Sequence, residues 1–278
     1  MRLAISNIAW DVTEDEQVAK LLNRYGIDAI DIAPGKYFPD PAKATDEEIA
    51  RVKQWWVERG IELTGMQALL FGTSGLNVFG APEVQEALLQ HLAAVCRIGA
   101  GLGAIRIVFG SPKNRDRSGL SDEQVQAIAV QFFRRLGDIA QIHGVIIYLE
   151  PNPPCYGANF MTNSDETAAI VRQVSHPAIR MQLDTGAITI NGEDPATVLE
   201  NYASLIGHVH ASEPEIAPLG DKGTDHAMAA ACLRRLLPDS IVTIEMLATK
   251  NEPHLVSIER ALKVAVNFYR NVGDGVAV

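Results

Sequence analysis

Cysteine, basic charge and long apolar runs are all scarce in this chain of 278 residues. The three cysteines, Cys96, Cys155 and Cys232, are an odd number at wide spacing, which excludes a disulfide framework and a paired-cysteine metal site. This usage is typical of a reducing cytoplasm. No apolar stretch approaches the roughly 20 residues that span a bilayer, and the first residues show no signal-peptide layout. We therefore expect a cytoplasmic protein with no membrane segment.

Positive charge is the second shortage. Lysine and arginine number 24 against 34 aspartates and glutamates, for a formal net charge of −10. Such a chain is a poor ligand for nucleic acid or an anionic membrane surface. No linker rich in proline, glycine or serine divides the sequence, so we expect one domain over residues 1–278. The tail, Gly273–Val278, is expected to fray.

What the sequence does have is an alternation of strand-like and helix-like segments. Eight strands are predicted: Arg2–Asn7, Asp28–Ala33, Ile61–Met66, Ala104–Phe109, Val145–Glu150, Ile179–Asp184, Ile206–His210 and Ser240–Glu245. The strand-to-helix loops are the longer ones, as in barrels whose C-terminal face carries the chemistry. We therefore predict an α/β protein with a single (β/α)8 TIM barrel. A doubly wound sheet is the alternative, but the first turn, Ile8–Asp11, lacks a glycine-rich phosphate loop.

Metal-capable side chains end four consecutive strands in the second half of the chain. They are Glu150, Asp184, His210 and Glu245. Because the C-terminal ends of barrel strands meet on one face, these side chains should converge. Carboxylate oxygens with one imidazole suit a divalent cation such as Mn²⁺, Mg²⁺, Co²⁺ or Zn²⁺. The sequence therefore predicts a site for one divalent metal ion.

The sequence around these four residues resembles that of the xylose isomerase-like TIM barrel superfamily, which includes the sugar phosphate isomerase/epimerase family, dehydratases and AP endonucleases. Four segments carry the resemblance: Leu149–Asn152, Leu183–Gly186, His208–His210 and Pro218–Asp225. The resemblance covers almost the whole chain and implies that the four strand-end residues are the metal ligands. It also implies that Glu150 and Glu245 serve as an acid/base pair, with Asp184 and His210 as ligands only.

A small sugar, sugar acid or related α-hydroxycarbonyl compound is the implied substrate, and proton transfer through an enediolate is the implied chemistry. Return of the proton to the same carbon gives epimerisation, and return to the adjacent carbon gives isomerisation. Loss of a β-hydroxyl group instead gives a dehydratase or lyase. A non-catalytic sugar-binding barrel is a further alternative, and a homo-oligomer stays open.

The chain departs from the ketose 3-epimerase pattern at three positions. Ala187, Ile216 and Tyr156 stand where those epimerases have a histidine, an arginine and a glutamate that hold the sugar. AP endonucleases need additional zinc-binding histidines, and Ala187 and Gln67 occupy two of those places. These departures disfavour a free-ketohexose epimerase and, together with the acidic charge, a DNA nuclease.

Residues near the strand ends are candidates for substrate contacts. Trp10, Asn152 and Tyr156 can line a sugar pocket by stacking and hydrogen bonding, although packing and turn roles fit equally well. Lys222, between two loop glycines, is a candidate for holding an anion.

Two further groups of residues have a structural interpretation as the favoured one. Lys113, Arg115 and Arg117 are expected to form a solvated basic loop rather than a phosphate or carboxylate site. His208 is expected to point away from His210, because side chains alternate along a strand, and to be structural.

Overall fold

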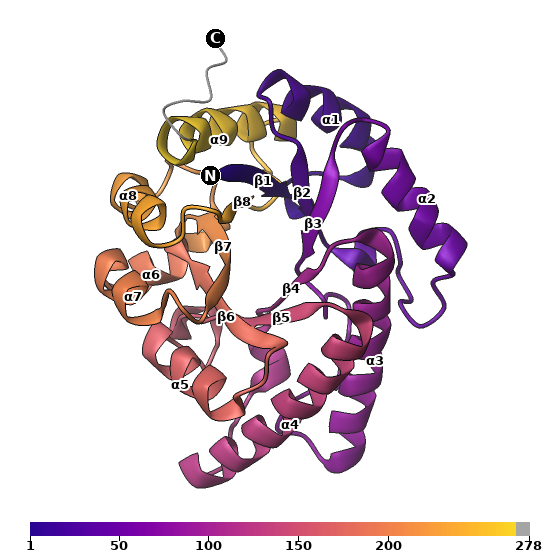
Figure 1. Ribbon diagram of the computed structural model, residues 1–278, viewed down its shortest axis with the longest axis vertical. Coiled ribbons are helices and arrows are strands. Elements are labelled where there is room, and N and C mark those ends of the chain that lie inside the picture. Colours follow the sequence, from indigo (N-terminus) through magenta and orange to yellow (C-terminus); the bar gives the residue numbers. More distant parts are fainter. Residues whose placement is uncertain (271–278) are drawn as a thin grey trace.

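Eight parallel strands pair in sequence order, and β1 also pairs with β8, so the sheet closes into a barrel surrounded by helices (Figure 1). The computed structural model describes residues 1–270. The predicted α/β TIM barrel is therefore confirmed. The tail Gly273–Val278, which was expected to fray, lies outside the described residues.

The strands are β1 (Arg2–Ser6), β2 (Ala29–Ile32), β3 (Glu62–Met66), β4 (Arg106–Phe109), β5 (Ile146–Leu149), β6 (Ile179–Asp184), β7 (Ile206–Ser212) and β8 (Ile241–Glu245). The helices are α1 (Asp15–Arg24), α2 (Asp46–Val57), α3 (Pro82–Leu102), α4 (Asp122–His143), α5 (Ser164–Val174), α6 (Thr185–Asn191), α7 (Pro195–Tyr202), α8 (His226–Leu236) and α9 (His254–Tyr269). Two differences from expectation stand out: β7 continues two residues past His210, and α6 was not predicted.

Local sequence signals set the ends of several helices. Thr45 is the N-cap of α2 and Ser121 is the N-cap of α4, and each forms a reciprocal capping box that satisfies the first free N–H groups. Gly144 is the C-cap of α4 and has the left-handed conformation, with φ of 68°. Glycine adopts this conformation at little energetic cost because it has no Cβ atom. These signals fix where α2 and α4 begin and where α4 ends.

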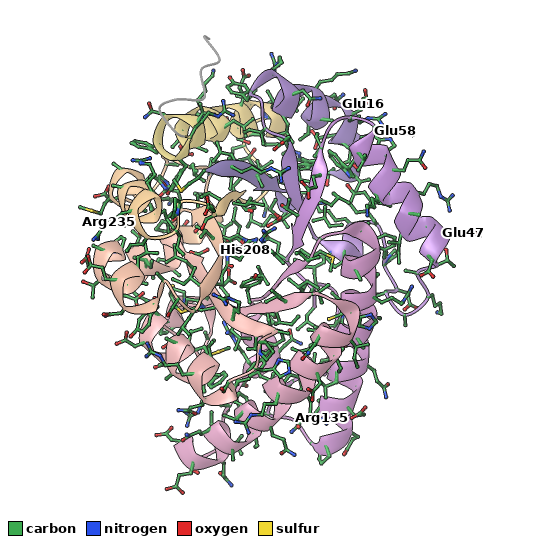
Figure 2. All side chains as sticks on the ribbon, in the orientation of Figure 1. Glu16, Glu47, Glu58, Arg135, His208 and Arg235 are labelled. Carbon is green, nitrogen blue, oxygen red and sulfur yellow. The ribbon has the colours of Figure 1, made fainter. Side chains whose placement is uncertain are left out.

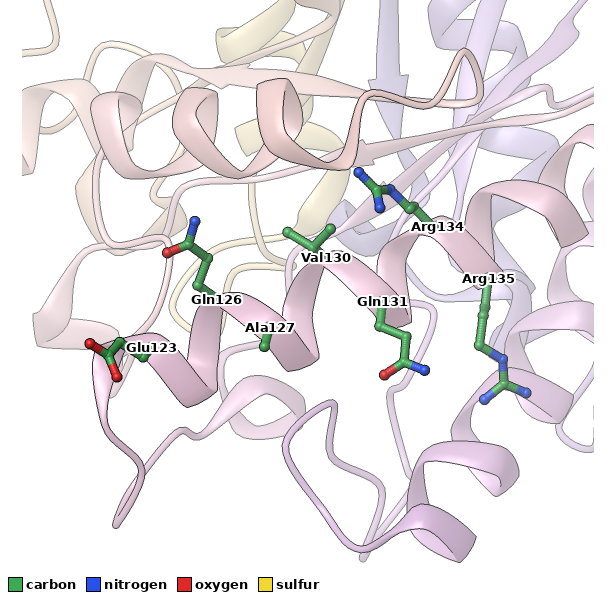
Figure 3. A pocket seen from close by; sticks show the side chains of 7 residues that line it. All are labelled: Glu123, Gln126, Ala127, Val130, Gln131, Arg134 and Arg135. Carbon is green, nitrogen blue, oxygen red and sulfur yellow. The ribbon is translucent and has the colours of Figure 1, made fainter.

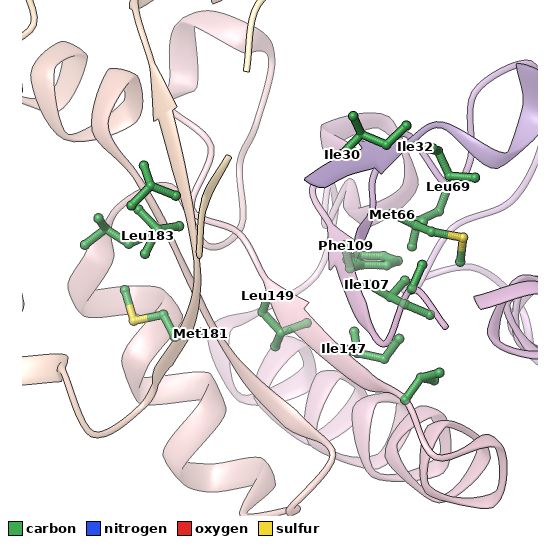
Figure 4. Packing of buried hydrophobic residues seen from close by; sticks show 14 of the residues in the cluster. Ile30, Ile32, Met66, Leu69, Ile107, Phe109, Ile147, Leu149, Met181 and Leu183 are labelled. Carbon is green, nitrogen blue, oxygen red and sulfur yellow. The ribbon is translucent and has the colours of Figure 1, made fainter. Parts of the chain in front are cut away.

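The apolar core lies between the sheet and the helices. Alternate strand residues face outward and form part of one buried cluster (Figure 4): Ile30, Ile32, Ile107, Phe109, Ile147, Leu149, Met181 and Leu183. The Phe109 ring, for example, meets Phe133 of α4 edge to face, with centroids 5.6 Å apart. The other face of each strand points into the barrel, and several of those side chains are polar. The space between the sheet and the helices is therefore apolar, whereas the interior of the barrel contains polar side chains.

Candidate metal centre

The four predicted strand-end residues come together at the C-terminal mouth of the barrel. Glu150 directly follows β5, while Asp184 and Glu245 are the last residues of β6 and β8. His210 lies opposite Asp184 in the register of β6 and β7. One ligand atom from each of the four lies within 4.8 Å of those of the other three, and all four residues are buried.

His210 lies at the centre of this group. Its Nδ1 atom is 3.3 Å from Glu150 Oε1, 3.3 Å from Glu245 Oε2 and 3.8 Å from Asp184 Oδ2. Neither ring nitrogen of His210 makes a hydrogen bond with any described residue, and Glu150 Oε1 also lacks one. Buried polar atoms without partners are costly, so this arrangement calls for a ligand.

The second oxygen of each carboxylate is held by a neighbouring donor. The Gln67 amide donates to Glu245 Oε1 at 2.6 Å, and the Asn152 amide donates to Glu150 Oε2 at 3.1 Å. Asp184 Oδ1 accepts from the Ala187 N–H at 2.6 Å and from the Ser212 hydroxyl at 2.8 Å. Each carboxylate therefore has one oxygen fixed and the other turned toward His210.

This geometry fits a divalent cation. Ligand atoms within 4.8 Å of one another can share a single ion at the roughly 2.0–2.3 Å typical of such bonds. The donors on the outer oxygens match the hydrogen bonds that orient metal ligands in known centres. The role of these four residues as ligands stays a prediction, to which the geometry adds support.

Mutual charge also shifts the pKa values of the cluster. Burial raises the pKa of Asp184 well above its usual range, and the charges of Glu245 and Glu150 add to the effect. Burial alone would lower the pKa of His210, but the charges of Glu245 and Glu150 outweigh it and raise that pKa well above its usual value. Burial alone would raise the pKa of Glu245, but the charge of His210 holds it below its usual value.

His208 does not point away from His210, and that expectation was wrong. Residues two apart on a strand share a face, and the centroids of the two imidazole rings are 5.0 Å apart. Figure 2 shows His208 near the centre of the barrel. His208 lies one layer below the candidate centre. Its Nε2 is 2.7 Å from Asp31 Oδ2 and its Nδ1 is 2.7 Å from Gln182 Oε1.

The predicted substrate-contact residues lie in different surroundings. Trp10 is 1% exposed and donates its indole N–H to Asp15 at 2.7 Å. Asn152 is half-buried beside Glu150. Tyr156 is 37% exposed, and its hydroxyl accepts from the Glu215 N–H at 2.7 Å. Lys222 is exposed and pairs with the Glu215 carboxylate at 3.2 Å. Of these, Asn152 alone hydrogen-bonds to one of the four central residues within the described chain.

The basic loop after β4 is not uniformly solvated, contrary to expectation. Lys113 is exposed and Arg117 pairs with Asp122, but Arg115 is fully buried and donates to the main-chain oxygen of Glu150 at 2.8 Å. Sequence reasoning also missed the supporting roles of Gln67 and Ser212. The available signal was their position, since each lies at or directly after the C-terminal end of a strand.

A groove of about 570 Å³ lies elsewhere, on the outer wall of the barrel (Figure 3). It follows one side of α4, from Glu123 to Arg135, and includes none of the four central residues. No helix among residues 1–270 has the length and apolar character to cross a membrane.

Comparison with known proteins gives the same architecture. Residues 19–270 match the family described as xylose isomerase-like TIM barrel. The D-psicose 3-epimerase from Clostridium cellulolyticum H10, solved with D-tagatose, superposes with a TM-score of 0.79 at 18% identity, covering 97% of this chain and 98% of that one. The IOLI protein, solved with a zinc atom, gives 0.75 at 17% identity, covering 97% and 98%.

One curated relative matches over a shorter segment. The mannonate dehydratase of Rhizobium meliloti (strain 1021) is 27% identical over 130 residues. The match spans 44% of this chain and 32% of that protein. It thus covers about a third of that relative's length.

Proposed function

This chain belongs to the xylose isomerase-like TIM barrel family, and we propose that it is a divalent-metal-dependent isomerase or epimerase of a small sugar or related α-hydroxycarbonyl compound. One observation carries the proposal. Three carboxylate oxygens surround His210 Nδ1 at 3.3 to 3.8 Å in a buried cluster at the mouth of the barrel. The sugar epimerases among the structural relatives support the substrate class, and the zinc atom in the IOLI structure supports a metal.

In this proposal Glu150, Asp184, His210 and Glu245 hold the cation. When bound, the ion supplies Lewis-acid polarisation of a substrate carbonyl, which makes the neighbouring C–H more acidic. Glu150 and Glu245 approach from β5 and β8, and each places an oxygen 3.3 Å from His210 Nδ1. A substrate carbon between these two carboxylates would lose its proton to one and receive a proton from the other. Positioned acid–base groups of this kind contribute roughly 10²–10⁴-fold to the rate.

The experiment is a screen of ketoses, aldoses, polyols and keto acids by NMR in D₂O. Deuterium should enter the substrate at the labile carbon, EDTA should abolish the exchange, and Mn²⁺, Co²⁺ or Mg²⁺ should restore it. Glu150→Gln and Glu245→Gln should each stop the exchange. Glu62→Gln is the matched control, because Glu62 is an exposed strand residue at the opposite end of the barrel. Exchange that survives complete metal removal contradicts the proposal.

A dehydratase acting at the same site is the second candidate, favoured by the match to mannonate dehydratase. The same carboxylate would remove the proton, and the β-hydroxyl would then leave as water with a proton from the second acid. The same NMR screen separates the two functions. A dehydrated product without epimer or isomer assigns the dehydratase.

A further inference from the structure

Among residues 1–270, Arg115 is the only lysine or arginine that is buried, and it forms no ion pair there. Its Nη1 donates to the main-chain oxygen of Glu150 at 2.8 Å, while its Nε and Nη2 atoms are buried without a partner. Burying a charge whose donors lack partners is energetically unfavourable. A benefit elsewhere must offset this cost.

The end of β4 and the loop after it lie against both the main chain and the carboxylate of Glu150. The Glu150 N–H donates to the Phe109 oxygen at the end of β4, at 3.2 Å, and Arg115 binds the Glu150 oxygen. Between them lies Gly110, where a Cβ atom would stand 1.9 Å from Glu150 Oε2. The carboxylate therefore occupies the space that a side chain at position 110 would fill.

The charge of the candidate centre also favours a functional role for Arg115 beside Glu150. As metal ligands, the three carboxylates would be ionised, and a divalent cation would neutralise two of their three negative charges. One negative charge would remain in a buried site. The Arg115 guanidinium, which donates to the Glu150 main-chain oxygen at 2.8 Å, supplies a positive charge beside this site.

We propose that the segment Gly110–Arg115 is the positioning element for Glu150, with Gly110 providing the space for the carboxylate and Arg115 fixing the main chain and balancing the remaining charge. This inference rests on the proposed metal site. Arg115 and Gly110 are positioning residues, because they act through Glu150 rather than on a substrate.

The test uses Co²⁺ alone as the probe, with affinity and the visible ligand-field spectrum as readouts. Gly110→Ala and Arg115→Met should each weaken Co²⁺ binding about 10- to 100-fold, the range found when the partners of metal ligands are removed, and should alter the spectrum. Two controls should stay within twofold of the wild type. Gly35→Ala adds a Cβ with nothing within 4 Å, and Arg134→Met removes an arginine that donates to main-chain oxygens on the outer wall.

The outcomes separate the two proposals. If the wild type binds no Co²⁺, the proposed metal site fails and this inference fails with it. If the wild type binds Co²⁺ and folded Gly110→Ala and Arg115→Met keep its affinity and spectrum, this inference alone is overturned. If Arg115→Met does not fold, Gly110→Ala decides, because position 110 does not have the left-handed φ that favours glycine and the three atoms nearest to a Cβ there all belong to Glu150.

Discussion

Gln67 holds one glutamate of the candidate centre from across the barrel. It follows β3, and its amide donates to Glu245 Oε1 at 2.6 Å, while its own Oε1 is buried without a partner. We expect Gln67→Ala to weaken metal binding about 10- to 100-fold, because Glu245 loses the donor that orients it. Titration with Mn²⁺ or Co²⁺ measures this. Gln54→Ala, which removes an exposed amide paired with Glu58, is the control, and equal affinities in the two variants would contradict the argument.

Protonation of the candidate ligands should make metal binding depend on pH. The pKa values of Asp184 and His210 are both raised, so each holds a proton to higher pH than usual, and ligation must displace it. Glu245, whose pKa is lowered, is already ionised at neutral pH. Affinity should therefore rise from pH 6 to pH 8, by up to about tenfold per pH unit for each proton displaced. Calorimetry in buffers of different ionisation enthalpy counts those protons, and a pH-independent affinity without proton release would contradict this.

The same shifts set the pH dependence of the metal-free fold. His210, with a raised pKa, contributes stability that is complete below its unfolded pKa and is lost as pH rises through the folded one. The raised pKa of Asp184 acts in the same direction, because the folded state retains a proton that the unfolded state gives up. The free energy of unfolding without metal should therefore fall between pH 6 and pH 8. Urea unfolding in EDTA measures it, and a rise over that range would contradict the assignment.

At the residue scale, the four strand-end residues were easier to predict from the sequence than the residues that hydrogen-bond to them. Glu150, Asp184, His210 and Glu245 could be located because apolar runs end in polar residues at those points. The direction of His208 was also available, since two residues on one strand share a face, and it was misjudged. The burial of Arg115 could not be predicted, because it depends on the loop after β4 turning its side chain under Glu150.

At the scale of elements, Glu213 holds the loop between β7 and α8. Its buried carboxylate accepts from the Gly220 N–H at 2.7 Å and the Thr224 N–H at 2.9 Å, and its Oε1 is 3.1 Å from His226 Nε2. Glu213→Gln would turn an amide N–H₂ group toward donors, so we expect a loss of about 1–3 kcal/mol of stability. Hydrogen exchange should quicken in residues 214–225. Glu215→Gln, at an exposed position of the same loop, is the control; equal exchange in both variants would contradict this role.

Helix α6 was not predicted, because its sequence favours a helix only weakly. Its sequence, Thr185–Asn191, contains a glycine and several β-branched residues, which favour helix weakly. The helix forms because Asp184 accepts the Ala187 N–H as its N-cap and the Ser212 hydroxyl accepts the Gly186 N–H at 2.9 Å. The local N-cap and the tertiary contact between α6 and β7 thus supply what local propensity lacks. The eight strands had regular apolar spacing, and their observed bounds lie within a few residues of the predicted ones.

At the scale of the whole molecule, the closed barrel places three buried carboxylates beside one another, and their mutual repulsion opposes folding unless a cation or proton offsets it. A ligand that binds only the folded state stabilises it by about 2.7 kcal/mol at 100 times its dissociation constant. For a chain of this size we expect saturating Mn²⁺ to raise the melting temperature by roughly 5–10 °C over EDTA. Scanning calorimetry at pH 7.5 measures the difference. Glu150→Gln should show a smaller shift and Glu62→Gln the full one, because Glu62 lies at the other end of the barrel. Identical melting of the wild type in Mn²⁺ and EDTA would mean that the carboxylates cluster for a reason other than holding a metal ion.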